Sequence, residues 1–66
     1  MKIVYQGRDT ETACGTVAEF LAEKGVDLSK AIVEFMGEVY APGADLGKAA
    51  LSEGAALDVF RLAAGG

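Results

Sequence analysis

One helical pattern stands among five extended patterns in this chain, and that order restricts the fold more than any other feature. The extended patterns, rich in β-branched or alternating apolar residues, cover residues 1–6, 10–13, 31–36, 39–40 and 57–62. The helical pattern falls between the second and the third of them. This order predicts an α+β fold, with one main helix packed on a mixed sheet of about five strands.

The helix is expected to begin at a capping box. In that motif the Thr16 hydroxyl accepts from the Glu19 amide, while the Glu19 side chain reaches back. The apolar residues that share the inner face of the helix are Val17, Phe20 and Leu21. Gly25 followed by Val26 is typical of a left-handed C-terminal stop, so the helix is predicted to be short.

Turns and loops separate these segments. Turns are expected at 7–9, 37–38 and 52–54, and a polar loop at 27–30. Pro42 ends strand pairing because proline cannot donate to a ladder, and residues 44–51 then form a connection with one helical turn around Leu46. Leu46 and Leu51 are expected to close the edge of the core.

The length of the chain allows one domain, residues 1–66, and a domain of this size buries only roughly 60% of its unfolded surface. No apolar run approaches the ~20 residues that a membrane-spanning helix needs, and the N-terminus lacks the pattern of a signal peptide. We therefore expect a cytoplasmic protein with no membrane partner.

Metal, redox and independent catalytic roles find little support. Histidine is absent, and the single cysteine, Cys14, excludes an internal disulfide framework and the usual Cys/His zinc sites. Cys14 could be a reactive thiol, but a small, half-buried side chain is the simpler interpretation. The carboxylates show no motif that pairs two of them, and so short a chain cannot readily enclose a small-molecule pocket. We expect no bound cofactor.

The charge balance bears on the class of partner. Ten acidic and six basic residues give a formal charge of −4, the wrong sign for binding a phosphate backbone. Nucleic acid is therefore not expected as a partner. An acidic surface favours encounter with a protein that bears a basic patch, although solubility explains it equally well.

The chain stops at Gly65 and Gly66, so its α-carboxylate is carried on two residues without side chains. Glycine lets backbone pass where a Cβ would collide, so such an end could enter a narrow site on another protein. Residues 63–66 are expected to form a flexible tail that reaches at most roughly 13–14 Å, at about 3.3–3.6 Å per residue. Ala63 and Ala64 keep this tail slim.

Several short elements resemble one family when they are taken in order. They are MKIV at 1–4, GTV at 15–17, the segment 31–40 followed by Pro42, SEG at 52–54 and AGG at 64–66. Their order and spacing over essentially the whole chain resemble the thiamine-biosynthesis sulfur carriers, the ThiS branch of the ThiS/MoaD ubiquitin-like family. The resemblance implies a ubiquitin-like β-grasp, in which the first and last strands lie side by side.

The chain departs from the family pattern at two places. Members often carry an asparagine where this chain has Met36 and Gly37, and an acidic residue where it has Ala55. Neither departure touches the tail, but both leave the branch open. The small subunit of molybdopterin synthase and other ubiquitin-like sulfur carriers share the fold and the ending, while the short chain favours the thiamine branch.

The resemblance implies that the Gly66 carboxylate is the reactive group. An ATP-dependent adenylyltransferase of the ubiquitin-activating type would form an acyl-adenylate, and sulfur from a cysteine desulfurase would displace AMP to leave a thiocarboxylate. A thiazole synthase would then take the sulfur. The chain would be a protein co-substrate, monomeric when free, and ATP would be used by the activating partner.

The family's partner surface lies on the open face of the sheet and near the tail. The resemblance therefore makes docking candidates of Phe60, Arg61, Leu62, Ala63, Ala64 and Gly65. The alternation in the last strand leaves open whether Leu57 and Val59, or Phe60 and Leu62, face the helix. For Phe60 taken alone, a core position is the favoured alternative.

Other interpretations stay open beside the sulfur carrier. The chain could be a binding or protein-conjugation module, whose Gly66 ends in an isopeptide bond to a lysine or has no covalent role. The two glycines could also result from truncation, in which case extra residues after Gly66 would not affect function. An independent enzyme is the least supported class.

Overall fold

The computed structural model describes residues 1–62, and this part of the chain contains five strands, one α-helix and one short 3-10 helix. In chain order they are β1 (Lys2–Tyr5), β2 (Arg8–Glu11), α1 (Val17–Glu23), η1 (Leu28–Lys30), β3 (Ala31–Phe35), β4 (Glu38–Tyr40) and β5 (Ala56–Arg61). The predicted α+β order is confirmed, and η1 is an element that the sequence did not reveal. The tail expected at residues 63–66 lies outside the described residues.

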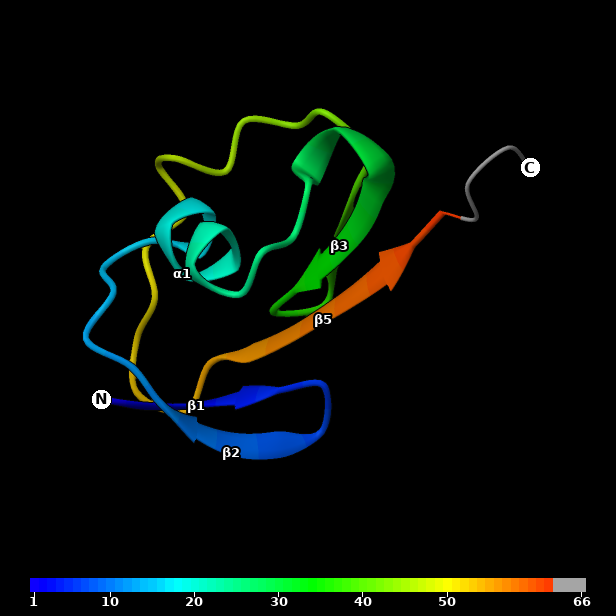
Figure 1. Ribbon diagram of the computed structural model, residues 1–66. Coiled ribbons are helices and arrows are strands. Elements are labelled where there is room, and N and C mark those ends of the chain that lie inside the picture. The colour runs from blue at the N-terminus through cyan, green and yellow to red at the C-terminus, as the bar shows by residue number, and fades with distance from the viewer. Residues whose placement is uncertain (63–66) are drawn as a thin grey trace.

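The five strands form one mixed sheet in the order β2-β1-β5-β3-β4. The first and last strands, β1 and β5, run parallel in the sheet, whereas β1–β2, β3–β5 and β3–β4 are antiparallel pairs. Helix α1 covers one side of this sheet (Figure 1). The side-by-side placement of the first and last strands is the arrangement that the sequence resemblance implied.

Both hairpins turn through two residues with positive φ. Gln6 and Gly7 have φ of 53° and 78°, and Met36 and Gly37 have φ of 52° and 84°. Two-residue loops with this geometry match the right-handed twist of the strands they join. They therefore connect β1 to β2 and β3 to β4 without opening the sheet.

The predicted bounds of the second strand in each hairpin are corrected by these turns. β2 begins at Arg8, two residues before the predicted strand, and β4 begins at Glu38, one residue before. The sequence prediction failed because Gln6 and Met36 are not residue types that favour positive φ. Both were assigned to strands for that reason.

The side chain of Gln6 holds this unfavourable backbone position in place. Its Nε2 donates to the Val59 carbonyl at 3.0 Å, and its Oε1 accepts from the Val59 amide at 2.8 Å. The side-chain amide thus pairs with β5 as the backbone of a further strand residue would. It extends a β1–β5 pairing that otherwise contains two residue pairs.

Helix α1 begins and ends as predicted. The Glu19 amide donates to Thr16 Oγ1 at 3.2 Å, and the Glu19 carboxylate reaches back to accept from the same hydroxyl at 3.2 Å. At the other end, Gly25 has φ of 75°, the Val26 amide donates to the Leu21 carbonyl at 2.9 Å, and the Gly25 amide donates to the Ala22 carbonyl at 3.1 Å. These bonds form a Schellman motif, which satisfies carbonyls at the end of the helix.

The loop after α1 contains η1, which Asp27 caps. The Asp27 carboxylate accepts from the Ser29 hydroxyl at 2.6 Å and from the Ser29 amide at 3.0 Å. The hydroxyl bond, then the amide bond and the nearby Lys30 ammonium, lower the pKa of Asp27. Because η1 leads directly into β3, this cap helps to set where β3 enters the sheet.

The connection from β4 to β5, all of it described by the structure, contains no assigned helix, but it makes one hydrogen-bonded turn at Leu46, whose carbonyl accepts from the Ala49 amide at 3.3 Å. Carbonyls of this connection also bond to the start of α1: the Val17 amide donates to the Ala49 carbonyl at 2.9 Å, and the Ala18 amide donates to the Leu46 carbonyl at 3.3 Å. The first amides of a helix lack hydrogen-bond partners within the helix, and these carbonyls of the connection supply them. Leu46 and Leu51 are buried, as predicted.

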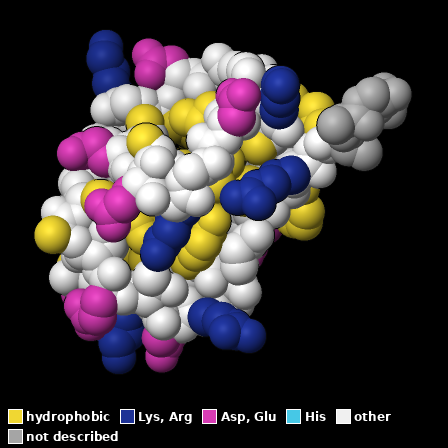
Figure 2. All heavy atoms as spheres, viewed as in Figure 1, with side chains coloured by type: hydrophobic (Ala, Val, Ile, Leu, Met, Phe, Trp, Pro, Cys, Tyr) yellow, Lys and Arg dark blue, Asp and Glu magenta, His cyan; other side chains and the backbone are white. Residues whose placement is uncertain are grey.

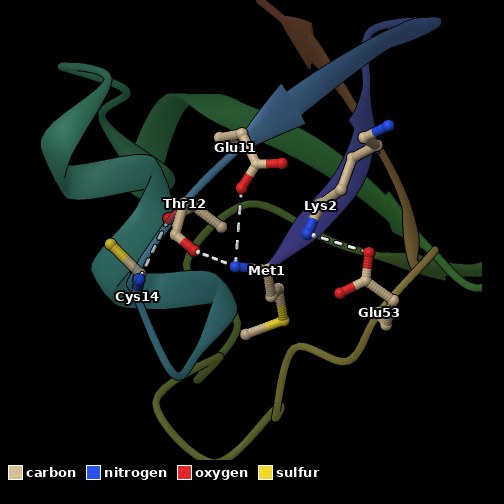
Figure 3. A network of polar contacts seen from close by, with 6 residues as sticks. All are labelled: Met1, Lys2, Glu11, Thr12, Cys14 and Glu53. Carbon is tan, nitrogen blue, oxygen red and sulfur yellow. Dashed lines mark hydrogen bonds and ion pairs between the residues drawn. The ribbon is translucent and has the colours of Figure 1, made fainter.

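The start of β1 is held by polar contacts (Figure 3). The Met1 ammonium donates to the Thr12 carbonyl at 3.0 Å and lies 3.6 Å from Glu11 Oε2. The Lys2 amide donates to Glu53 Oε2 at 3.1 Å, which links β1 to the predicted turn that precedes β5. β1 is therefore fixed on both of its edges.

The core lies between α1 and the sheet. Its buried hydrophobic residues are Ile3, Val17, Phe20, Leu21, Val26, Ala31, Val33, Leu46, Leu51, Ala55, Leu57 and Val59. Tyr5 packs edge-on against Phe20, with ring centroids 4.9 Å apart. Among residues 1–62, no helix has the length and apolar character needed to cross a membrane.

Candidate functional site

The structure settles which side of β5 faces the core. Leu57 and Val59 are 0% and 6% exposed, whereas Phe60 and Leu62 are 56% and 51% exposed. The core position favoured for Phe60 is therefore wrong. Alternation could not decide between the two sets because both are apolar, and only their contact with the helix layer distinguishes them.

The side of the sheet opposite α1, here called the open face, is apolar mainly around β5, β3 and β4. Strand alternation and register assign to this part of it Val4, Ile32, Glu34, Val39, Ala56, Asp58 and Phe60. On β1 and β2 the same face carries the charged residues Lys2, Asp9 and Glu11. Phe60 on β5 lies directly opposite Ile32 on β3, and Val39 is 66% exposed on the edge strand β4. Exposed apolar patches on a small protein commonly mark interaction sites.

The end of β5 is attached firmly to the sheet. Arg61 is the register partner of Ala31, and the Leu62 amide donates to the Lys30 carbonyl at 3.0 Å. Figure 2 shows hydrophobic side chains at the surface around this end of the molecule. The chain therefore leaves the sheet from a defined position, beside η1 and next to the open face.

The predicted docking residues that the structure describes do not all share one face. Phe60 and Leu62 continue the same alternation and are both exposed. Arg61 is also exposed, but alternation places it on the side of β5 that carries the buried Val59. A partner on the open face would therefore meet Phe60 and Leu62 directly and Arg61 at the margin.

The other predicted site residues, Ala63, Ala64, Gly65 and Gly66, lie outside the described residues. They follow Leu62 directly in the sequence. Four residues span at most roughly 13–14 Å, at about 3.3–3.6 Å per residue, and this is the length of chain that joins Gly66 to Leu62.

Phe60 apart, the residues of the open face were not predicted as site residues, among them Ile32, Glu34, Val39 and Asp58. All four belong to segments that the sequence identified as strands, so their alternation was visible. What the sequence did not contain was the register of β3 against β5, which places Glu34 opposite Asp58. That register depends on which apolar set packs on the helix.

The described residues outside the open face offer few reactive groups. Cys14 is half-buried, and its Sγ donates to Glu23 Oε2 at 3.2 Å on the helix side of the molecule. The Tyr40 hydroxyl donates to Glu38 Oε2 at 3.2 Å, and this bond raises the pKa of Tyr40. Within residues 1–62, no group of three or more Cys, Asp or Glu side chains is placed to hold a metal ion.

Comparison with solved structures gives a match over the whole chain. The thiamine biosynthesis protein ThiS from Geobacter metallireducens superposes with a TM-score of 0.75 and 23% sequence identity, covering 100% of both chains. The chain has the β-grasp fold of ThiS. The fold class predicted from the sequence is therefore confirmed. At this sequence identity, the likeness shows that the two proteins share a fold.

Two further comparisons, with protein-family models and with curated proteins, gave no match. No protein-family model matches the chain, and no curated protein matches its sequence. The likeness to ThiS is carried by the arrangement of one helix on a five-stranded mixed sheet. Any activity of the chain must be argued from the end of β5, the open face and the sequence that follows them.

Proposed function

We propose that this chain is a sulfur carrier of the ThiS type, with Gly66 as its reactive residue. One juxtaposition supports the proposal: in a ThiS fold, β5 presents the exposed Phe60, and the exposed Leu62 that follows β5 leads directly into the sequence Ala-Ala-Gly-Gly. The folded body serves as a recognition surface, and the last residues deliver an unhindered carboxylate to a partner's site.

The chemistry requires activation by a partner. An α-carboxyl group has a pKa near 3.3–3.7, so at neutral pH the Gly66 carboxylate is an anion that does not react with sulfur nucleophiles. Its oxygen attacks the α-phosphorus of ATP, and pyrophosphate leaves. A persulfide from a cysteine desulfurase then displaces AMP to form an acyl disulfide, and a thiol supplies the two electrons that release the thiocarboxylate.

The chain acts as a co-substrate rather than as an enzyme in this scheme. An ATP-dependent adenylyltransferase of the ubiquitin-activating type makes the adenylate, and a thiazole synthase receives the sulfur. The carrier is cytoplasmic and monomeric when free, and it binds neither nucleic acid nor membrane. Its net charge of −4 suits an encounter with basic protein surfaces and opposes binding to phosphate backbones.

The first experiment tests the role of Gly66. The purified chain is incubated with ATP and the adenylyltransferase, cysteine desulfurase and thiazole synthase of the same genome, and its terminus is followed by mass spectrometry. We expect one terminal oxygen to be replaced by sulfur in the native chain. Deletion of Gly66 should abolish sulfur transfer without changing the thermal unfolding curve, and unimpaired transfer by this variant would refute the proposal.

Variants of the neighbouring residues separate steric access from chain length. Gly65→Val should fold normally but form adenylate poorly, because a β-branched side chain obstructs a narrow site. Ala64→Gly is the matched control, since it makes the segment slimmer, and it should be adenylated normally.

The same reconstitution identifies the protein or compound that accepts the sulfur. Transfer to thiazole assembly supports the ThiS assignment, whereas transfer to a molybdopterin precursor would make the chain the small subunit of molybdopterin synthase. Isopeptide conjugates of the chain in its own cells would instead indicate a protein modifier. Normal function with extra residues after Gly66 would indicate that the two glycines result from truncation.

A further inference from the structure

Two carboxylates face each other in the middle of the open face. Glu34 on β3 and Asp58 on β5 are register partners in the antiparallel ladder, and both residues are half-buried. Side chains directly opposed in this way have Cβ atoms about 4.5–5.5 Å apart, and like charges at that spacing destabilise a sheet. The fold therefore carries a repulsive pair at this position.

No described residue neutralises this pair. Within residues 1–62, the ion pair that forms joins the Met1 ammonium to Glu11, on the β1–β2 side of the sheet. Arg61 is near in sequence, but strand alternation directs it to the other side of β5. The two carboxylates thus lack a cation of their own among the described side chains.

Apolar side chains border the pair. Two residues farther along β5, Phe60 lies opposite Ile32, and on the edge strand Val39 lies opposite Glu34. Phe60 and Val39 are 56% and 66% exposed. Around β5, β3 and β4 the open face is consequently an apolar surface with two negative charges, while Lys2, Asp9 and Glu11 lie on its β1–β2 part.

This combination restricts what can cover the face. A partner that met it with apolar groups alone would remove water from two carboxylates and leave them unpaired, which is strongly unfavourable. A partner with a cation at the matching point would relieve the repulsion and form charge-assisted hydrogen bonds to both oxygens. A guanidinium suits this position better than an ammonium, because its planar donors can reach two carboxylates and its faces pack on apolar side chains.

We propose that the open face docks a protein surface that presents one arginine, surrounded by apolar side chains, between Glu34 and Asp58. The occupant is the adenylyltransferase that receives Gly66, so this inference rests on the proposed function. The open face borders the end of β5 and the neighbouring Leu62, which at most roughly 14 Å of chain joins to Gly66. The net charge of −4 also favours a basic partner.

The paired carboxylates then select the partner as well as bind it. A protein without the matching cation is rejected because docking would bury two unpaired charges. Selection of this kind explains why a small domain would keep a pair that works against its own folding.

The test compares binding with folding in the same variants. Glu34→Gln and Asp58→Asn remove one charge each with little change of shape, and Glu23→Gln is the matched control on α1, across the core from the open face. Affinity for the adenylyltransferase is measured by calorimetry without ATP at two salt concentrations, and stability by urea unfolding. We expect each open-face variant to bind at least about 10-fold more weakly, with a shallower salt dependence.

Stability provides the discriminating readout. The open-face variants should be as stable as the native chain or more stable, because the repulsion is reduced, whereas a purely structural role would make them less stable. The control should bind within about twofold of the native chain. Equal binding by all variants, or lower stability in parallel with weaker binding, would overturn the inference.

The two proposals fail in different ways. Normal adenylation together with unchanged affinity in the open-face variants would overturn the arginine-docking inference and leave the sulfur carrier standing. Binding that depends on Glu34 and Asp58 without any Gly66 adenylate would overturn the proposed function and support the docking inference. No binding by the native chain would overturn the docking inference directly.

Discussion

At the scale of single residues, Gln6 shows how a side chain can make an unfavourable backbone conformation part of the fold. A non-glycine residue at φ of 53° is destabilised by the contact between its Cβ and the backbone. Two hydrogen bonds between the Gln6 side-chain amide and the Val59 backbone, one donated and one accepted by Gln6, offset this conformational strain. The residue that ends β1 therefore also helps to join β1 to β5.

We predict that Gln6→Ala lowers the free energy of unfolding by about 1–3 kcal/mol, because two hydrogen bonds of about 0.5–1.5 kcal/mol each are lost. Gln6→Asn is the informative control. Asparagine favours positive φ, but its amide is one methylene too short to bond Val59. Both variants should unfold at lower urea concentration, and an Asn variant more stable than the native chain would show that the side-chain bonds contribute nothing.

At the scale of elements, the structure confirms the segments whose boundary residues carry their own chemistry. Helix α1 was predicted at both ends because Thr16, Glu19 and Gly25 each satisfy backbone groups locally. The hairpin bounds were wrong because their positive φ is adopted by Gln6 and Met36, whose residue types do not signal it. Around Leu46 the chain makes a single hydrogen-bonded turn, and the sequence did not reveal that its carbonyls also bond to a helix distant in sequence.

The C-terminal stop of α1 gives a prediction that isolates backbone conformation from packing. Gly25 has φ of 75°, and a Cβ added there would meet no atom within 4 Å. Gly25→Ala should therefore lower the free energy of unfolding by roughly 1–2 kcal/mol through conformational strain alone.

Gly15→Ala is the matched control for this prediction. A Cβ at Gly15 would make an ordinary 3.6 Å contact with Glu19 Oε1, and its φ is not positive. This variant should be unchanged or more stable by about 0.4–1 kcal/mol, because alanine restricts the unfolded chain. Equal losses in both variants, measured by urea unfolding, would contradict the role assigned to the left-handed stop.

At the scale of the whole molecule, one side of the sheet packs against the helix and the other side is exposed. The side against α1 holds Leu57 and Val59 and supplies stability, whereas the open face holds Phe60 and the opposed pair Glu34 and Asp58. The sequence predicted both sets of β5 residues but not their sides. That choice depends on how the strand meets the helix, which no local pattern records.

This division predicts opposite outcomes for two nearby apolar residues of β5. Leu57 is fully buried, so Leu57→Ala should lower the free energy of unfolding by about 2–5 kcal/mol, enough to unfold much of so small a domain. Phe60 is 56% exposed, so Phe60→Ala should lower it by less than about 1 kcal/mol, the value of its cross-strand contact with Ile32.

The same two variants separate folding from docking when adenylation is measured. Phe60→Ala should remain folded by circular dichroism but require a higher carrier concentration for half-maximal adenylation, because the apolar surface proposed for docking is reduced. Leu57→Ala should lose adenylation only in proportion to the fraction unfolded. If Phe60→Ala unfolded like Leu57→Ala, Phe60 would belong to the core. If it were adenylated like the native chain, the open face would not be the surface that the activating enzyme recognises.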